Sequence, residues 1–588
     1  MYGMLIQKRN IMKRISRTIN IETYKMIIVI VLLTISIIRI LIQFRIPYCI
    51  NPGEPVDDGL MQKIALHLFH GEYLGVYDEF TLCKNWVYSY LLAFCYKFLF
   101  PYPLLLGFLN IGSAYAVCRS FKNNISFVPR ALMYVLLIFS PITFAELPAL
   151  RIYRNSIIQY FTLLVFAGFI GLFLRKEEKS IKPLIPWVVL ECVSLPLFWF
   201  IKEDSIWILP FCVVITVLAL VWVFIHQREN IIKKAIVFLG PFIATIIMSL
   251  GISFANYNHY GLFATDDRAH TEAANVYSAF LHIEHDYDDG GVWVTNEMFE
   301  KAATVSPTFA PIWEEMKVLP HYKEENGEVL GDLFMWRIRH AMNEMGYYSN
   351  AVETNEIYKK VNNELQDAFK DGRLAEDNYI HISKIMKGLT IDEIIKCVPK
   401  AVKNMYHVSV YGDLELVGLA STGDLKKITT QQYLLGLNTY MRQPTDFQTD
   451  VFNYGSHLLE KINSIISIYQ KFGIVVDIFA IILFAVFIMT LIYYMSKKDF
   501  SKLNIFIVMC GIILSAFVVA FEFEAFSGYF NYLNSTFYDD YVEFYSVAMY
   551  PLISIFKYLA IILGIYEIVG FIKLVYKYLL NRKDNVYK

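Results

Sequence analysis

The sequence predicts a polytopic α-helical membrane protein, with about ten transmembrane helices and an α-rich extracytoplasmic domain inserted before the last three spans. Three observations predict this fold class. Only 18% of the 588 residues are charged, whereas a soluble domain has about 25%. Long apolar stretches recur along the chain. Basic residues occupy every second connection between these stretches.

The predicted spans are apolar stretches of about 16 to 25 residues, which cross or nearly cross ~30 Å of hydrocarbon at about 1.5 Å per residue. They lie at about 26–46, 103–118, 127–145, 156–174, 183–201, 205–226, 235–256, 471–495, 503–522 and 547–575. A further apolar run, 86–100, is short, contains Lys97 and precedes a Pro-Tyr-Pro sequence. We expect this run to form an amphipathic helix in the outer interface.

Basic residues predict the orientation of the spans, because Lys and Arg are enriched in cytoplasmic connections. The first 25 residues contain six of them, namely Lys8, Arg9, Lys13, Arg14, Arg17 and Lys25. Alternate connections and the C-terminal end are basic as well, as at Arg175, Lys176, Lys497 and Lys583. The chain is therefore predicted to be a multi-pass protein of the cytoplasmic (plasma) membrane, with both termini in the cytoplasm.

This orientation divides the chain into four predicted segments. Residues 1–25 form a basic cytoplasmic N-terminus, and 26–256 form a transmembrane core with a large outer loop at 47–102. Residues 257–470 form the extracytoplasmic domain, for which the pattern favours an α-rich mixed α/β fold. Residues 471–588 form the last helices and a cytoplasmic tail.

The charge balance argues against nucleic-acid binding. Lys and Arg number 53, Asp and Glu number 54, and the formal net charge is −1. Proteins that bind nucleic acid through its phosphates carry clusters of basic residues that replace the counterions. No nucleic-acid partner is expected.

Two adjacent acids, Asp57 and Asp58, follow the first span directly, after Pro52 and Pro55. One interpretation is structural, since aspartate is a favoured N-cap and an apolar helical pattern ends at Gly71. The other is catalytic. Partial desolvation and a neighbouring negative charge would raise the pKa of one carboxyl, which suits a general base. The residues alone leave both interpretations open.

Other ionisable residues gather at the outer ends of spans. Few charges lie within the spans, whereas a transporter would concentrate them at the midplane. The second outer connection contains Glu146 and an Arg151-x-Tyr-Arg154 sequence, and the third is Lys202-Glu203-Asp204. Arginine binds phosphate bidentately, although basic and aromatic residues also anchor many spans at the interface.

The order of these motifs resembles the C-type glycosyltransferases. The resemblance rests on the acidic pair outside the first span, on Ala65 and Gly71 at fixed spacing from Asp57, and on the stretch 84–93. These polytopic enzymes include protein O-mannosyltransferases, oligosaccharyltransferases and lipid A aminoarabinose transferases. The pattern covers about the first 260 residues. The rest of the chain is similar to these enzymes only in its layout, with a large outer domain late in the chain.

The resemblance implies a polyprenyl-linked sugar donor and displacement at the anomeric carbon with inversion. Asp57 would be the base that takes the proton of the acceptor, and Asp58 would be its acidic partner. The donor phosphate would be bound by Arg151 and Arg154, with Lys202 as a further cation and Lys84 at a position where relatives often have proline.

The second acid and the metal are left open by the resemblance. Many relatives have a second acid where this sequence reads Arg154-Asn155. Glu146, Glu203 and Asp204 are the candidates to replace it. Some branches of the family hold a divalent cation between such acids and others do not, so no metal ligand is assigned.

The predicted function is that of a mannosyltransferase-like membrane enzyme of the hexosyltransferase type. It would transfer a sugar from a polyprenyl-phosphate donor to a glycan, lipid or protein acceptor of the cell envelope. The alternative is a flippase or exporter of lipid-linked glycan without catalytic activity. A sensor or scaffold would leave the aspartate pair and the two arginines unexplained.

Overall fold

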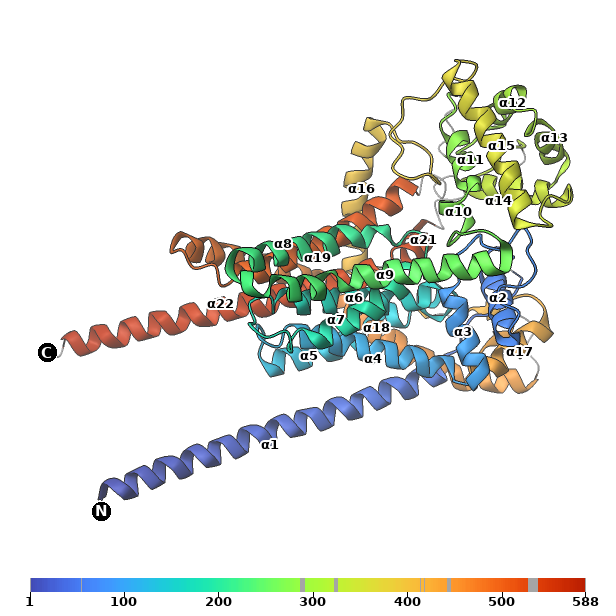
Figure 1. Cartoon of the computed structure of the whole chain (residues 1–588). Coiled ribbons are helices and arrows are strands. Elements are labelled where there is room, and N and C mark those ends of the chain that lie inside the picture. Colours follow the sequence, from blue (N-terminus) through green and yellow to red (C-terminus); the bar gives the residue numbers. More distant parts are fainter. Residues whose placement is uncertain are drawn as a thin grey trace.

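A computed structural model shows a bundle of long helices with a helical domain at one end (Figure 1). It describes residues 2–53, 55–285, 291–321, 326–412, 414–416, 418–441, 446–526 and 538–586. The bundle contains α1 (Tyr2–Arg45), α4 (Tyr102–Ser120), α5 (Phe127–Ile138), α6 (Asn155–Phe173), α7 (Ile185–Trp199), α8 (Leu209–His226), α9 (Ile231–Tyr260), α18 (Asp446–Ser496), α19 (Leu503–Phe526) and α22 (Met549–Val586).

The predicted class, a polytopic helical membrane protein, is confirmed. Among the described residues, seven helices are long and apolar enough to cross a membrane. These spans are formed by α1, α6, α8, α9, α18, α19 and α22. The other three predicted spans correspond to α4, α5 and α7, of which α5 and α7 are only 12 and 15 residues long. Helix α5 ends early because Ser140-Pro141 begins a short turn, η1 (Pro141–Thr143), and a second short helix, η2 (Glu146–Leu150), follows.

Helix α6 is the most deeply buried helix of the bundle, since every residue except Leu164 is buried. It packs against α4 and α7, and α7 packs against α9. Helix α22 packs against both α18 and α19 on another side of the bundle. The surface of α1 carries exposed apolar side chains such as Ile30, Leu33 and Ile37, which is the pattern of a lipid-facing helix.

The first outer loop contains α2 (Asp58–His70) and α3 (Val87–Phe98), which pack together. Helix α3 is the apolar run that we expected to be amphipathic. Its buried side includes Tyr88 and Leu92, and its exposed side includes Tyr90, Phe94 and Phe98. Its place in the interface remains a prediction.

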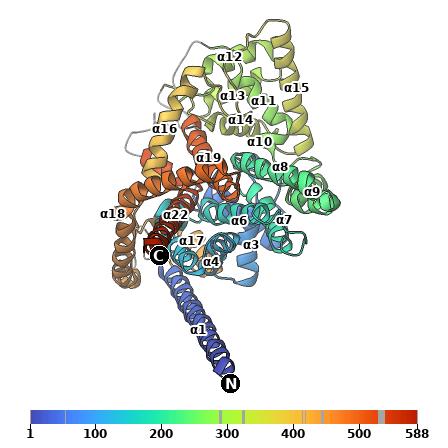
Figure 2. The same ribbon diagram turned by 90° about the vertical axis from the view of Figure 1, so that its left-hand side faces the viewer.

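The chain between α9 and α18 contains α10 (Asp267–His270), α11 (Glu272–Leu281), α12 (Asn296–Val305), α13 (Ala310–Val318), α14 (Leu333–Glu344) and α15 (Ala351–Lys370), which we call the end domain, followed by α16 (Ile391–Ser409) and α17 (Leu425–Leu435). Its strands β1 (Ala420–Ser421) and β2 (Tyr440–Met441) form one short parallel pair. The regular structure of the expected mixed α/β fold is therefore almost entirely helical in its described part. Helices α10–α15 form a compact group at one end, as Figure 2 also shows.

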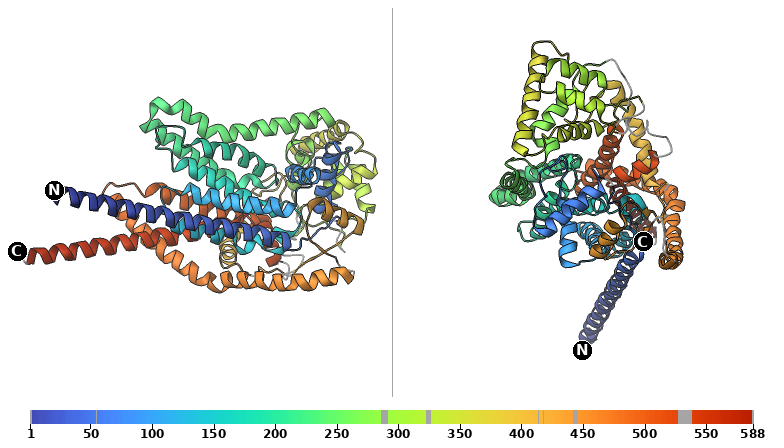
Figure 3. Two further views of the ribbon diagram at one scale, coloured as in Figure 1. Left: turned by 90° about the horizontal axis from the view of Figure 1, so that it is seen from below. Right: turned by 90° about the vertical axis from the view of Figure 1, so that its right-hand side faces the viewer.

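Both terminal helices leave the bundle at the end opposite this group (Figure 3). The two termini therefore lie on the same side of the bundle, and their cytoplasmic location remains a prediction. Helix α18 continues without a break through residue 470, and α9 continues through residue 256. The boundary predicted at 25/26 lies within α1, so all three predicted segment boundaries fall inside continuous helices.

The close approach of α6 and α7 requires glycine. A Cβ atom at Gly171 would lie 2.2 Å from Cδ2 of Trp187, whereas one at Gly112 in α4 would meet no atom within 4 Å. We expect Gly171→Ala to lower the stability by about 1–3 kcal/mol through overpacking. The midpoint of thermal unfolding in detergent measures this loss. Gly112→Ala is the matched control, and equal midpoints for the two variants would contradict the packing described here.

Candidate active site

Asp57 occupies the N-cap position of α2 but does not cap it, because its side chain makes no hydrogen bond to the backbone of the helix. Its Oδ1 atom instead accepts hydrogen bonds from the Lys84 ammonium and, at 3.0 Å, from the Tyr153 hydroxyl. Lys84 lies just before α3. The structural interpretation of this acid is therefore wrong, and the carboxylate faces a charged cluster.

The Tyr153 hydroxyl connects the members of this cluster. Besides donating to Asp57, it lies 3.3 Å from Nζ of Lys84 and accepts a hydrogen bond from Nε of Arg154 at 3.1 Å. The Tyr153 ring is buried and stacks on Phe544 of α21 (Tyr538–Tyr545) with centroids 5.8 Å apart. This stacking holds the hydroxyl between the two cations and the acid.

Arg151 and Asp58 form the neighbouring ion pair, in which Nε of Arg151 donates to Oδ2 of Asp58 at 2.7 Å. Asp58 is the first residue of α2 and is nearly inaccessible, whereas Arg151 is partly exposed. The connection before α6 is positioned by backbone pairing, because the amide of Ile152 donates to the carbonyl of Cys49 at 3.0 Å. This pairing brings the first and second outer connections together.

The third outer connection joins the same network through Glu203. Its carboxylate accepts from Nη1 of Arg154 at 2.5 Å and from the backbone amide of Asn85 at 2.7 Å. Lys202 pairs with Asp204 at 2.7 Å and lies 5.8 Å from the ring of Tyr545. The first three predicted outer connections thus meet at one place, which we call the charged cluster: Asp57, Asp58, Lys84, Arg151, Tyr153, Arg154, Lys202, Glu203 and Asp204.

Each of the four predicted phosphate-binding cations has a carboxylate partner in this cluster. The pairs are Lys84 with Asp57, Arg151 with Asp58, Arg154 with Glu203, and Lys202 with Asp204. The four cation side chains are mostly buried, and a buried charge without a partner would be costly. Pairing therefore explains how four cations are accommodated in a small space.

The pairing also determines the protonation state of the acids. Burial raises the pKa of Asp57, but the nearby Lys84 outweighs this effect and holds the pKa well below its usual range. The upward pKa shift that we expected for one carboxyl of the pair is therefore not found at Asp57. Burial likewise raises the pKa of Glu203, but Arg154, Arg268 and Lys84 together lower it to about 2. Both acids are ionised at neutral pH.

Glu146 lies apart from this network. Its two carboxylate oxygens accept hydrogen bonds from the backbone amides of Gly418, at 2.7 Å, and Leu419. It thereby attaches the chain before β1 to the bundle. Of the three candidates for a second acid, Glu203 and Asp204 are the ones in the charged cluster, and Glu203 is linked to Asp57 through Arg154 and Tyr153.

A metal site has no support in the described residues, where no three His, Cys, Asp or Glu side chains lie together as metal ligands would. The acids of the charged cluster are separated by cations. The geometry therefore fits an anionic ligand better than a divalent cation.

Two members of the site region were not assigned roles from the sequence. Tyr153 lies within the Arg-x-Tyr-Arg sequence, so its proximity could have been inferred from that motif. Arg268 in α10 is partly buried, donates to Asp332 at 3.0 Å, and contributes to the low pKa of Glu203. It belongs to the end domain, and no local pattern could have brought it to the bundle.

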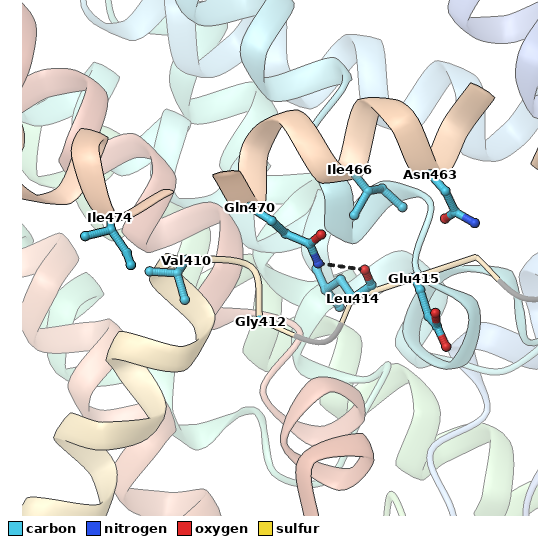
Figure 4. Close-up of a pocket in the computed structure, with 8 residues that line it drawn as sticks. All are labelled: Val410, Gly412, Leu414, Glu415, Asn463, Ile466, Gln470 and Ile474. Atoms are coloured by element: carbon cyan, nitrogen blue, oxygen red, sulfur yellow. Dashed lines mark hydrogen bonds between the residues drawn. The ribbon is translucent and has the colours of Figure 1, made fainter. Parts of the chain in front are cut away.

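A cavity of about 540 Å³ lies elsewhere, between the C-terminal end of α16 and helix α18 (Figure 4). Apolar side chains such as Val410, Ile466 and Ile474 line it together with Glu415 and Asn463. Gln470 donates to the carbonyl of Leu414 at 3.0 Å across one wall. None of the lining residues belongs to the charged cluster.

Comparison with known proteins gives little further information. No protein-family model matches the sequence, and no curated protein matches it. Among solved structures, the chain is similar to the crystal structure of ArnT from Cupriavidus metallidurans in the apo state. The sequence identity is 13%, the match covers 85% of this chain and 77% of that one, and the TM-score is 0.29. A similarity at this TM-score carries no argument about function.

The pair Arg154–Glu203 yields a stability prediction, because both side chains are about nine-tenths buried. Arg154→Ala leaves the Glu203 carboxylate without its main partner and should cost about 3–5 kcal/mol. The double variant Arg154→Ala, Glu203→Gln removes the unpaired charge and should recover part of that loss. Unfolding in detergent measures both variants.

The control for this experiment is Arg373→Ala, which removes an exposed ion pair with Asp371. Its unfolding midpoint should equal that of the unmodified protein. A double variant that is less stable than Arg154→Ala would contradict this prediction. It would show that the Glu203 carboxylate does not destabilise the protein when Arg154 is absent.

Proposed function

We propose that the chain is a membrane glycosyltransferase of the C-type. It transfers a sugar from a polyprenyl-phosphate donor to an acceptor of the cell envelope, with inversion and with Asp57 as the general base. The observation that carries this proposal is the contact of the uncapped Asp57 carboxylate with Lys84 and Tyr153, inside a cluster that also contains Arg151 and Arg154.

The cluster has the groups that such a reaction needs. The acceptor hydroxyl or amine attacks the anomeric carbon while Asp57 takes its proton. The bond from that carbon to the phosphate oxygen breaks, and the oxygen leaves with the electron pair. Cations near that oxygen stabilise its developing charge. Among the described residues, the guanidinium of Arg151 uses only Nε in hydrogen bonds, so its two terminal nitrogens can face a phosphate.

The ion pair of Lys84 with Asp57 indicates an order of events. A carboxylate whose pKa is held low is ionised but is a weak base. A donor phosphate attracts the Lys84 ammonium and so competes with Asp57 for it. As Lys84 moves toward the phosphate, the pKa of Asp57 rises, and the base becomes stronger when the donor is in place.

The flippase or exporter is less well supported by the positions of the charges. Three cations inside the bundle have local partners: Arg39 donates to the carbonyl of Ile138 at 2.9 Å, Lys557 pairs with Asp477 at 2.8 Å, and Lys502 pairs with Glu567. The buried Glu191 of α7 differs, because neither of its carboxylate oxygens has a hydrogen-bond partner among the described residues. A transport route would instead place polar groups along the bundle. The charged cluster lies where three outer connections meet.

The first functional test removes the base. Asp57→Asn keeps the size of the side chain and removes its proton affinity, so sugar transfer should fall by about 10²–10⁴-fold. The measurement is release of polyprenyl phosphate from a panel of polyprenyl-phosphate sugars by the protein in lipid vesicles. Asp371→Asn, on an exposed surface, is the control. Normal transfer by Asp57→Asn would end the general-base assignment.

The second functional test addresses the phosphate. Replacing Arg151 or Arg154 by Gln removes a charged hydrogen bond worth about 1.5–3 kcal/mol, so the KM for the lipid donor should rise by roughly tenfold or more. The KM for the acceptor should change little. Donor KM values that equal those of the unmodified protein would exclude these arginines as the phosphate ligands.

A further inference from the structure

Helix α16 carries an apolar stripe that no other part of the described chain covers. The stripe consists of Ile391, Ile395, Val398, Val402 and Tyr406, which are between 42% and 67% exposed. Their spacing of three or four residues places them on one face of the helix. An exposed apolar face of this length marks a surface that contacts a membrane or another molecule.

The other faces of α16 have different chemistry. Cys397, Ala401, Asn404 and Val408 are buried, and the helix packs against α19 and α22. The exposed lysines Lys396, Lys400 and Lys403 lie roughly 130° around the helix from the apolar stripe, at about 100° per residue. The helix therefore has one face for the bundle, one apolar face and one cationic face.

The anchoring of α16 places it beside membrane spans. Nδ2 of Asn404 donates to the Glu524 carboxylate of α19, and the Lys557 ammonium of α22 donates to the carbonyl of Ser409. In Figure 1, α16 lies across the direction of α8, α19 and α22, and in Figure 2 it is seen lengthwise where the bundle is seen end-on. The helix thus lies parallel to the plane that the spans cross.

The segment before the helix carries further exposed apolar side chains. Ile380 and Ile382 are 45% and 56% exposed. The backbone of Ile380 pairs with that of Leu389 through hydrogen bonds of 2.9 and 3.0 Å, next to the Thr390 cap of α16. Exposed isoleucines therefore continue past the beginning of the helix.

We propose that α16 is an interfacial helix that rests in the lipid surface on the side of α10–α15. The apolar stripe lies among the acyl chains, and the lysines lie at the lipid phosphates. Lipid fits this surface because the helix is attached to two spans in an in-plane direction, and because separate apolar and cationic faces are typical of helices in membrane interfaces. Tyr406, with an apolar ring and a polar hydroxyl, suits the same depth.

The test places a nitroxide label on each face of α16 in the full-length protein in phosphatidylcholine–phosphatidylglycerol bilayers. The eight cysteines are largely shielded, and Cys192 and Cys510, the two that are not buried, are first replaced by alanine. Labels follow Ile395→Cys, Val402→Cys and Lys400→Cys. Ile37→Cys on α1 is the lipid-facing reference, and Asp371→Cys is the water-facing reference. Relaxation by oxygen reports lipid, and relaxation by a soluble nickel chelate reports water.

We expect a severalfold higher ratio of oxygen to nickel accessibility at positions 395 and 402 than at position 400, with values near that of position 37. Nickel accessibility at 395 and 402 equal to that at 371 would overturn the proposal by showing a face in water. Low accessibility to both reagents would overturn it by showing a protein contact. If one stripe variant fails to fold, Ile391→Cys gives the same comparison.

Discussion

The rest of the site depends on the requirement that charges removed from water be paired. Lys84, Arg151, Arg154 and Lys202 are mostly buried where the outer connections meet, and each contacts one carboxylate. Because a single uncompensated charge there would cost several kcal/mol, the three connections must meet in one arrangement. The Tyr153 hydroxyl, with Asp57, Lys84 and Arg154 around it, is the centre of that arrangement.

The same requirement attaches the end domain to the bundle. Arg339 of α14 donates to the carbonyls of Glu79, at 2.6 Å, and Thr81, at 3.0 Å, and it also pairs with Asp267. Burial raises the pKa of Asp267 to about 6 despite this pairing. Arg268 contributes to the field at Glu203 from the neighbouring position. A displacement of α10 would therefore change the electrostatics of the charged cluster.

The charged residues within the spans differ in their surroundings from those of the charged cluster. Within the spans, Arg39 and Lys557 have partners close at hand, so they stabilise helix packing. At the end of the bundle, Asp57 remains partly exposed while its cationic partner is buried. A partly exposed base beside buried cations is suited to a reaction between a lipid-linked anion and a more polar molecule, which is the reaction that we propose.

The sequence by itself determined the membrane class, most of the spans and the residues that meet in the cluster. Apolar length and charge are local properties that a linear pattern records. Only the tertiary structure decided that Asp57 does not cap α2, that Lys84 lowers its pKa, that Glu146 binds backbone amides, and that Arg268 reaches the site. Each of these facts depends on contacts between segments that are far apart in the chain. Electrostatic effects depend on distance and burial, and these exist only once the helices have packed.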